Sequence, residues 1–188
     1  MDSPLAVNVT EVFRLHPECF DDETRVFITS DQDPFGFQRL HYVRSVQDSK
    51  ALNQLRVPCV IISASGMCEA GRVLHHLANN IEDGRNTVLI VGFQAQGTMG
   101  RRLVDRETTV HIFGEAYHRR AEVCVLNGLS GHADRNGLLE WIGNVNGSLR
   151  HIFLVHGDPN QSEALAGTLR ERKACPVTVP KPGERFEL

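Results

Sequence analysis

The chain has 188 residues, of which 41% are hydrophobic, 23% charged and 6% aromatic, with 16 Gly and 8 Pro. This composition is typical of a globular protein and excludes a disordered chain, a collagen-like repeat and a coiled coil. A chain of this length buries about 70% of the surface that its unfolded form exposes, so folding requires neither metal nor disulfide staples. The formal net charge of −3 excludes a global attraction to nucleic acid. Any phosphate contact must therefore come from a local cluster.

No segment predicts membrane insertion or export. The longest apolar stretches, around residues 57–64 and 87–93, are far shorter than the roughly 20 residues that span a bilayer. The opening residues, MDSP, have neither the basic start nor the apolar middle of a secretory signal. We therefore expect a cytoplasmic protein with no membrane partner. The five cysteines are odd in number and include no Cys-x-x-Cys pair, so we expect reduced thiols rather than disulfides or a zinc finger.

Hydrophobic periodicity and turn residues predict helices and strands that alternate along the chain. The predicted helices span residues 4–15, 46–55, 70–81, 99–104, 137–145 and 162–172. The predicted strands span residues 57–63, 87–91, 109–113, 122–126, 152–155 and 176–179. Asp2 or Ser3 caps the first helix, whose apolar face we expect to pack against a sheet. The alternation implies a parallel sheet and an α/β fold.

Two loops that join a strand to a helix, residues 63–72 and 92–102, contain glycines followed by arginine. Free backbone N–H groups at a helix start, with glycines that allow close approach, suit a phosphate group. The alternative is that the glycines only form tight turns and the arginines are solvated. Neither loop contains Gly-x-Gly-x-x-Gly or a Walker lysine, so a nucleotide-binding oxidoreductase or transferase has only the alternating fold in its favour.

Two of the nine histidines precede or follow predicted elements at positions suited to chemistry. His156 ends an apolar strand, and ligand sites in open α/β sheets gather beyond the carboxyl ends of the strands. The alternative is a hydrogen-bonded structural histidine. His132 lies between Ser130 and Asp134, but residues two apart cannot align as nucleophile, base and orienting group. Asp134 is better explained as a helix N-cap.

A further pair, His75 and His76, lies within a predicted helix. Adjacent helical residues point about 100° apart, so these two side chains do not form a chelate. We interpret both as surface or interface residues.

Five segments occur together in a fixed order along the chain. They are DSPLA at 2–6, SGM at 65–67, GFQAQGT at 92–98 followed by GR at 100–101, SGHAD at 130–134, and LVHGD at 154–158. Together they resemble the β-CASP subgroup of metallo-β-lactamase-fold nucleases, relatives of the endonuclease that cleaves messenger RNA precursors. The resemblance covers nearly the whole chain.

The resemblance implies a zinc-dependent ribonuclease that hydrolyses RNA phosphodiester bonds. His132 looks like the family's second β-CASP motif, a histidine that touches the scissile phosphate and protonates the leaving oxygen. His156 looks like the third motif, a ligand of one of two active-site zinc ions. The residues expected to hold RNA phosphates are Ser65, Gly66, Arg72, Gly97, Thr98 and Arg101.

The resemblance also implies the domain organisation. Residues 1–125 would form the C-terminal part of a parallel-sheet β-CASP lobe. Residues 126–188 would supply the C-terminal strands and helices of a metallo-β-lactamase fold. Two departures from the family pattern are mild, Gly131 in place of Ala and Asp158 in place of Glu.

A more serious departure is that the chain contains no His-x-His-x-Asp-His cluster. We therefore expect its partner to be a missing N-terminal metallo-β-lactamase half. The chain alone is expected neither to bind a stable zinc pair nor to cleave RNA, because each zinc needs about three or four ligands. Apolar surface left uncovered would favour homo-oligomers. The alternative function is a non-catalytic nucleic-acid-binding or assembly module.

Overall fold

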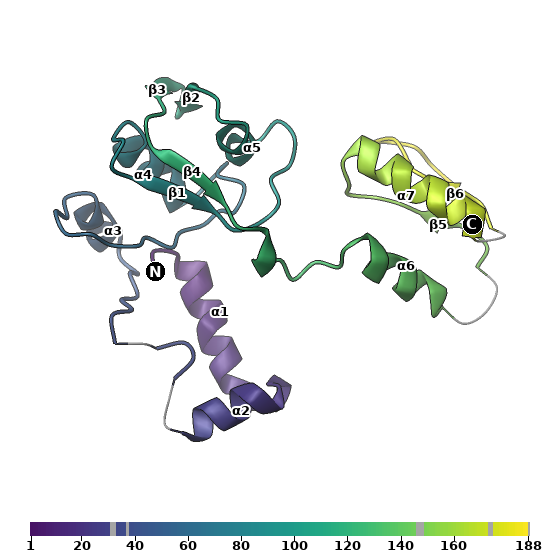
Figure 1. Cartoon of the computed structure of the whole chain (residues 1–188), viewed down its shortest axis with the longest axis horizontal. Helices are drawn as coiled ribbons and strands as arrows, with labels where there is room; N and C mark the ends of the chain where they lie inside the picture. The colour runs from purple at the N-terminus through teal and green to yellow at the C-terminus, as the bar shows by residue number, and fades with distance from the viewer. Residues whose placement is uncertain (31–32, 37, 146–148, 173–174, 188) are drawn as a thin grey trace. The chain divides into compact units, whose positions relative to one another are not determined.

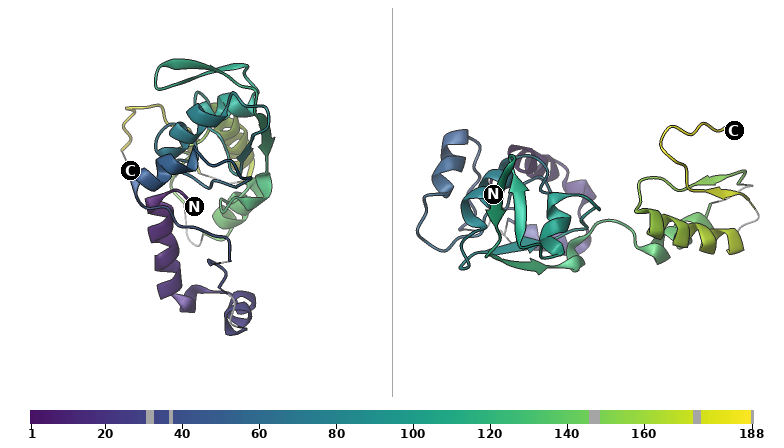
Figure 2. Two further views of the ribbon diagram at one scale, coloured as in Figure 1. Left: turned by 90° about the vertical axis from the view of Figure 1, so that its left-hand side faces the viewer. Right: turned by 90° about the horizontal axis from the view of Figure 1, so that it is seen from above.

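The computed structural model describes residues 1–30, 33–36, 38–145, 149–172 and 175–187. The chain divides into two compact units, Met1–Gly128 (unit 1) and Leu129–Leu188 (unit 2). Both contain helices and strands, which confirms the predicted α/β class (Figures 1 and 2). Among the helices in the described ranges, none has the length and apolar character needed to cross a membrane.

Unit 1 begins with helices and then alternates helix and strand. Its helices are α1 (Pro4–Leu15), the 3₁₀ helix η1 (Pro17–Cys19), α2 (Asp22–Thr29), α3 (Val46–Leu52), α4 (Arg72–Asn80) and α5 (Met99–Val104). Its strands are β1 (Thr87–Ile90), β2 (Thr109–Ile112), β3 (Glu115–His118) and β4 (Glu122–Val125). A short 3₁₀ helix, η2 (Asn127–Leu129), runs into unit 2.

Strands β1 and β4 pair in parallel, as the alternation of elements predicted, with Thr87 opposite Glu122 and Ile90 opposite Val125. Strands β2 and β3 instead form an antiparallel hairpin, which the sequence analysis did not predict. Phe113 and Gly114 form its two-residue turn, with φ of 53° and 84°. Positive φ at both turn residues is characteristic of the type I′ turn, whose twist matches that of the flanking strands.

The core of unit 1 lies between the sheet, the hairpin and helices α4 and α5. Its buried side chains include Leu77 and Ile81 near the end of α4, Leu103 on α5, and Val110 and Ile112 on β2. In Figure 1, α4, α5 and the hairpin surround the β1–β4 pair. This packing fixes the start of α4 and the loop before α5, where the predicted phosphate-binding residues lie.

The predicted strand at residues 57–63 is wrong. Within the described ranges this segment pairs only through a bridge between Asp2 and Ser63. Val60 is 86% exposed and Ile62 is 50% exposed. A continuous apolar run predicts a strand buried on both faces, but such a strand needs hydrogen-bonded neighbours. The described part of the chain does not supply them.

Helix α1 starts as predicted, with Ser3 Oγ accepting from the backbone N–H of Ala6 at 3.3 Å. Its predicted burial against a sheet is wrong. Only Val7 is buried, while Leu5 is 72% exposed and Phe13 contacts Phe35 at a ring distance of 6.1 Å. The hydrophobic periodicity therefore predicted helix α1 correctly, but no described sheet covers its apolar face.

Unit 2 contains α6 (Arg135–Gly143), β5 (Ile152–Phe153), α7 (Pro159–Arg172) and β6 (Val177–Thr178). Strands β5 and β6 are parallel, and α7 runs alongside them (Figure 1). The buried side chains at the centre of this unit are Ile142, Ala166, Leu169 and Val177. The order of elements matches the prediction, although both strands are shorter than expected.

Candidate functional site

The two glycine-containing loops predicted to bind phosphate lie against each other in unit 1. The N–H of Gly100 donates to the carbonyl of Met67 at 3.0 Å. The amide nitrogen of Gln94 donates to the carbonyl of Gly66 at 3.0 Å. The N–H of Met99, at the start of α5, donates to the Glu69 carboxylate. Segments separated by about one strand and one helix thus form a single structural body.

Helix α5 uses its first N–H groups within the chain. Met99 and Gly100 donate to the loop before α4, and Arg101 donates to Thr98 Oγ1 at 3.2 Å. The amides expected to be free for a phosphate are therefore already paired. Gly97 is exposed with φ of 81°, and Thr98 caps the helix. Their assignment to phosphate binding stays a prediction.

In the loop before α4, Ser65 is half-buried and Gly66 is exposed. Ser65 closes the loop on itself, since its N–H donates to the carbonyl of Ala70 at 3.0 Å and its carbonyl accepts from Cys68 at 3.1 Å. A Cβ added to Gly66 would contact no other atom within 4 Å. Gly66 therefore lies at an open surface, and phosphate binding at Ser65 and Gly66 stays a prediction.

Both predicted arginines have carboxylate partners. Arg72 Nη1 lies 2.5 Å from Asp2 Oδ1, and its Nη2 donates to the carbonyl of Arg44 at 2.7 Å. Arg101 Nε donates to Asp105 Oδ2 at 2.9 Å across one helical turn. Arg72 is thus anchored within unit 1 instead of being solvated. Phosphate binding by either guanidinium stays a prediction.

Asp2 is the centre of a buried polar network in unit 1. Its side chain has no exposed surface, and Oδ2 accepts from Ser49 Oγ at 2.6 Å and contacts His76 Nε2 at 2.6 Å. Burial raises the pKa of the Asp2 carboxyl, but hydrogen bonds from Ser49, His76 and Arg72 and the charge of Arg72 outweigh it, so its pKa lies below the ordinary 3.8. The network joins the start of α1 to α3 and α4.

The structure corrects the interpretation of the histidine pair on α4. His76 is only 7% exposed, and its Nδ1 lies 3.0 Å from Asn53 Oδ1. It is therefore a buried member of the Asp2 network and not a surface residue. His75 is exposed as predicted, and its ring lies 4.7 Å from that of Phe113.

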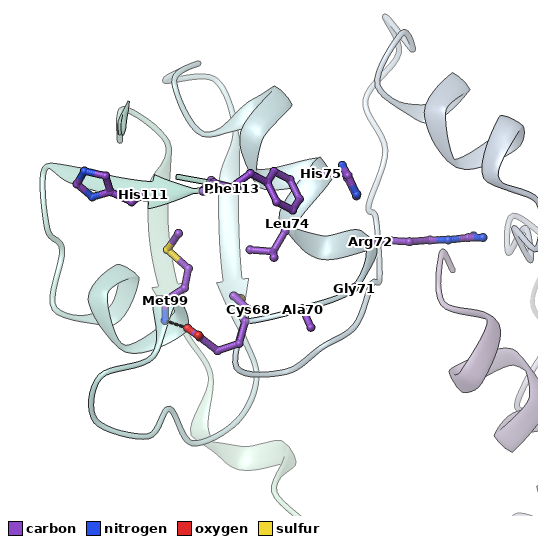
Figure 3. Close-up of a pocket in the computed structure, with 11 residues that line it drawn as sticks. Cys68, Ala70, Gly71, Arg72, Leu74, His75, Met99, His111 and Phe113 are labelled. Atoms are coloured by element: carbon purple, nitrogen blue, oxygen red, sulfur yellow. Dashed lines mark hydrogen bonds between the residues drawn. The ribbon is translucent and has the colours of Figure 1, made fainter. Parts of the chain in front are cut away.

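A cavity of about 640 Å³ opens between the loop before α4 and the β2–β3 hairpin. Its lining residues are Cys68, Glu69, Ala70, Gly71, Arg72, Leu74, His75, Met99, His111, Ile112 and Phe113. Figure 3 shows Phe113, His75 and Leu74 close together, while the Arg72 side chain points away toward α1. Burial raises the pKa of the Cys68 thiol to about 11, with a further contribution from Glu69, so this thiol is not a reactive thiolate.

The two histidines predicted to act in catalysis belong to unit 2 and both are exposed. His132 lies two residues before Asp134, which is the N-cap of α6 as predicted: Asp134 Oδ1 accepts from Gly137 N–H at 2.8 Å. His156 has φ of 63° and follows β5, whose pairing continues through a bond from Leu154 N–H to the Thr178 carbonyl at 2.9 Å. It therefore lies at the carboxyl end of a parallel strand, where the sequence predicted it.

The metal-binding side chains that the structure describes do not by themselves form a metal site. Across the described ranges, no three His, Cys, Asp or Glu side chains gather closely enough to hold an ion. A zinc ion in a structural or catalytic site takes at least three protein ligands. The side chains that the structure describes therefore do not by themselves provide the ligands of a zinc pair.

Comparison with known proteins identifies the class. A family described as the Beta-Casp domain matches residues 1–103, and one described as a Zn-dependent metallo-hydrolase RNA specificity domain matches residues 116–180. Together the two matches cover most of the chain, and the Beta-Casp match alone covers more than half of it. The chain belongs to the β-CASP family, which confirms the predicted resemblance. The predicted domain limits, 1–125 and 126–188, stay a prediction.

Individual relatives are similar over nearly all of this chain. Ribonuclease TTHA0252 of Thermus thermophilus is 36% identical over 184 residues, which cover 98% of this chain and 42% of the relative. Transcription termination factor FttA of Methanosarcina mazei is 32% identical over 169 residues, or 87% of this chain and 26% of the factor. An RNase J-like protein of Methanocaldococcus jannaschii is 27% identical over 177 residues, which cover 94% of this chain and 40% of the relative. The chain thus spans less than half the length of these relatives.

Two features of the candidate site were not predicted from the sequence. One is the network around Asp2 and His76, whose partners are far apart in the chain. The other is the contact between His75 and Phe113. The dipeptide Phe113-Gly114 was the available signal, because a glycine after an extended run indicates a tight turn.

Proposed function

We propose that this chain is the RNA-binding part of a zinc-dependent ribonuclease and that it contributes His132 and His156 to the catalytic centre. The observation that supports this most directly is the position of both histidines within the segment that matches the RNA specificity domain. Both are exposed, one before a capped helix and one beyond a strand end. Exposed imidazoles at such positions can contact a substrate phosphate.

His132 is the proposed proton donor of the reaction. When the phosphodiester bond breaks, the leaving oxygen gains negative charge and needs a proton. A His132 imidazolium within hydrogen-bond reach of that oxygen would supply it. General acid catalysis of this kind contributes about 10²- to 10⁴-fold in rate.

His156 is the proposed metal ligand. Bound zinc would supply a nucleophilic hydroxide and neutralise charge on the phosphate. Because the described side chains form no metal cluster, the proposal requires further ligands from a metallo-β-lactamase half outside this chain. The same observation favours a second candidate, a non-catalytic RNA-binding module, for the chain when it acts alone.

The experiment compares this chain with the longer protein of which we propose it is a part. Zinc content is measured by mass spectrometry, and cleavage with an end-labelled single-stranded RNA. The chain alone should show neither tight zinc binding nor cleavage. In the longer protein, His132→Ala should lower the cleavage rate about 10²- to 10⁴-fold with unchanged zinc content. His156→Ala should lower both.

The control is His118→Ala, which removes an exposed imidazole from β3. It should change neither zinc content nor cleavage. Tight binding of two zinc ions by the chain alone, or full activity of the His132 variant, would refute the proposal.

A further inference from the structure

The β2–β3 hairpin has an aromatic residue at a turn position that does not favour a bulky side chain. Phe113 has φ of 53° and is the first residue of a two-residue turn. Asn or Asp followed by Gly is strongly preferred in such turns, because a side chain with a bulky Cβ substituent is strained at positive φ. Phe113 is also 60% exposed, so burial of its ring does not offset this strain.

Strained residues of this kind cluster at functional sites, where the surrounding structure holds them in place. Here the strained residue borders the cavity described above. The His75 ring, from α4, lies 4.7 Å from the Phe113 ring at an angle of 37°. The pair therefore contributes aromatic surface to the lining of the cavity, and Figure 3 shows the two side chains near each other.

The rest of the cavity suits a flat, partly apolar group. Leu74, Met99 and Ile112 give it apolar walls, and His111 adds a further imidazole to the lining. The volume of about 640 Å³ lies within the usual range for ligand sites, about 300–1,000 Å³. The charged Arg72 and Glu69 in the lining are already engaged with Asp2 and Met99. The ligand is therefore held mainly by stacking and apolar contact.

We propose that this cavity binds one unpaired nucleobase of the RNA strand, stacked on Phe113 beside His75. The inference rests on the proposed function for its choice of RNA as ligand. Stacking on an aromatic ring accepts any base, because every base has a π-face. The site would hold the strand without reading its sequence.

The test measures RNA binding without cleavage. The chain is titrated into a fluorescein-labelled single-stranded RNA of mixed sequence, in EDTA, and fluorescence anisotropy gives the Kd. Phe113→Ala should weaken binding about 5- to 140-fold, the range expected for loss of one stacked base. Phe113→Trp should restore most of the affinity. Phe27→Ala removes a ring that is 42% exposed on α2 and should leave the Kd unchanged.

A second variant separates binding from folding. Phe113→Asn places the preferred residue in the turn, so it should raise the thermal stability of the chain while weakening RNA binding as much as Phe113→Ala does. A series of RNAs is then compared, in each of which one base has been removed from the strand. Removal of the stacked base should weaken binding to the unmodified chain but not to Phe113→Asn.

Three outcomes would overturn the inference. They are no measurable RNA binding by the chain, an unchanged Kd for Phe113→Ala, or an equal loss in the Phe27→Ala control. The proposed catalytic function fails separately, through the zinc and cleavage results for His132 and His156. If RNA binding depends on Phe113 but the cleavage and zinc results do not depend on His132 and His156, the base-binding site stands and the catalytic proposal is refuted.

Discussion

Replacing Asp2 by Asn should destabilise unit 1 strongly, because the change removes the negative charge at the centre of a buried network. Asp2 has no exposed surface, and it is bonded to Arg72, His76 and Ser49 at 2.5–2.6 Å. The Asn side chain keeps the shape but leaves the Arg72 guanidinium without its counter-charge. Breaking a buried ion pair by changing one partner costs about 3–5 kcal/mol.

The Arg72 side chain is 19% exposed, so water compensates part of the lost interaction. We therefore expect a loss of about 2–3 kcal/mol in the free energy of unfolding of unit 1, which is at or just below the lower limit for buried pairs. The matched control is Asp83→Asn, which breaks an ion pair with Arg85 whose side chains are 38% and 86% exposed. Exposed pairs contribute little to stability, so the control should change unfolding only slightly.

The chain contains an internal reporter for this measurement. Trp141 is its single tryptophan and lies on α6 in unit 2, whereas the mutation lies in unit 1. In a urea titration, far-ultraviolet circular dichroism follows both units and Trp141 fluorescence follows unit 2. Asp2→Asn should shift the dichroism transition and leave the fluorescence transition in place. A shift no larger than that of Asp83→Asn would refute the assigned role of the network.

Two further predictions concern the same unit. Because the folded pKa of Asp2 lies below 3.8, its contribution to stability is fully present well above pH 3.8 and is lost as the pH falls through the folded pKa. The difference in urea midpoint between the unmodified chain and Asp2→Asn should therefore stay constant from pH 7 to about pH 5 and shrink at lower pH. A constant difference down to about pH 2 would contradict the stabilising role assigned to the ionised Asp2 carboxylate. Gly100→Ala should destabilise unit 1 by about 1–3 kcal/mol, because its Cβ would lie 1.6 Å from Gln94 Oε1, whose amide is held by three carbonyls. Gly92→Ala, which meets no atom within 4 Å, is the control for the same thermal or urea titration, and equal midpoints for the two variants would contradict this account.

Local signals allowed several elements of the fold to be predicted. Ser3 and Asp134 cap helices at the predicted positions, and α5 spans the predicted residues 99–104. The parallel pairing of β1 with β4 also followed from the alternation of strand and helix. These features depend on residues within a few positions of one another, or on the order of elements, so periodicity and capping suffice to find them.

Other features depend on contacts between residues far apart in the chain. Asp2 and Arg72 are 70 positions apart, and no local pattern indicates that α4 buries His76 against that carboxylate. The apolar run at 57–63 satisfies every local criterion for a strand, yet it lacks the neighbours that a strand needs. The presence of a strand depends on its partners as much as on its own residues.

The candidate site divides in the same way. The amino-acid sequence alone determined the family, through ordered motifs that include His132 and His156, and it located His156 at a strand end. Only the tertiary structure decided that Arg72 is anchored to Asp2, and that Phe113 and His75 border one cavity. The physical reason is that a motif records which groups are present, whereas the partner of each group is set by packing between distant segments.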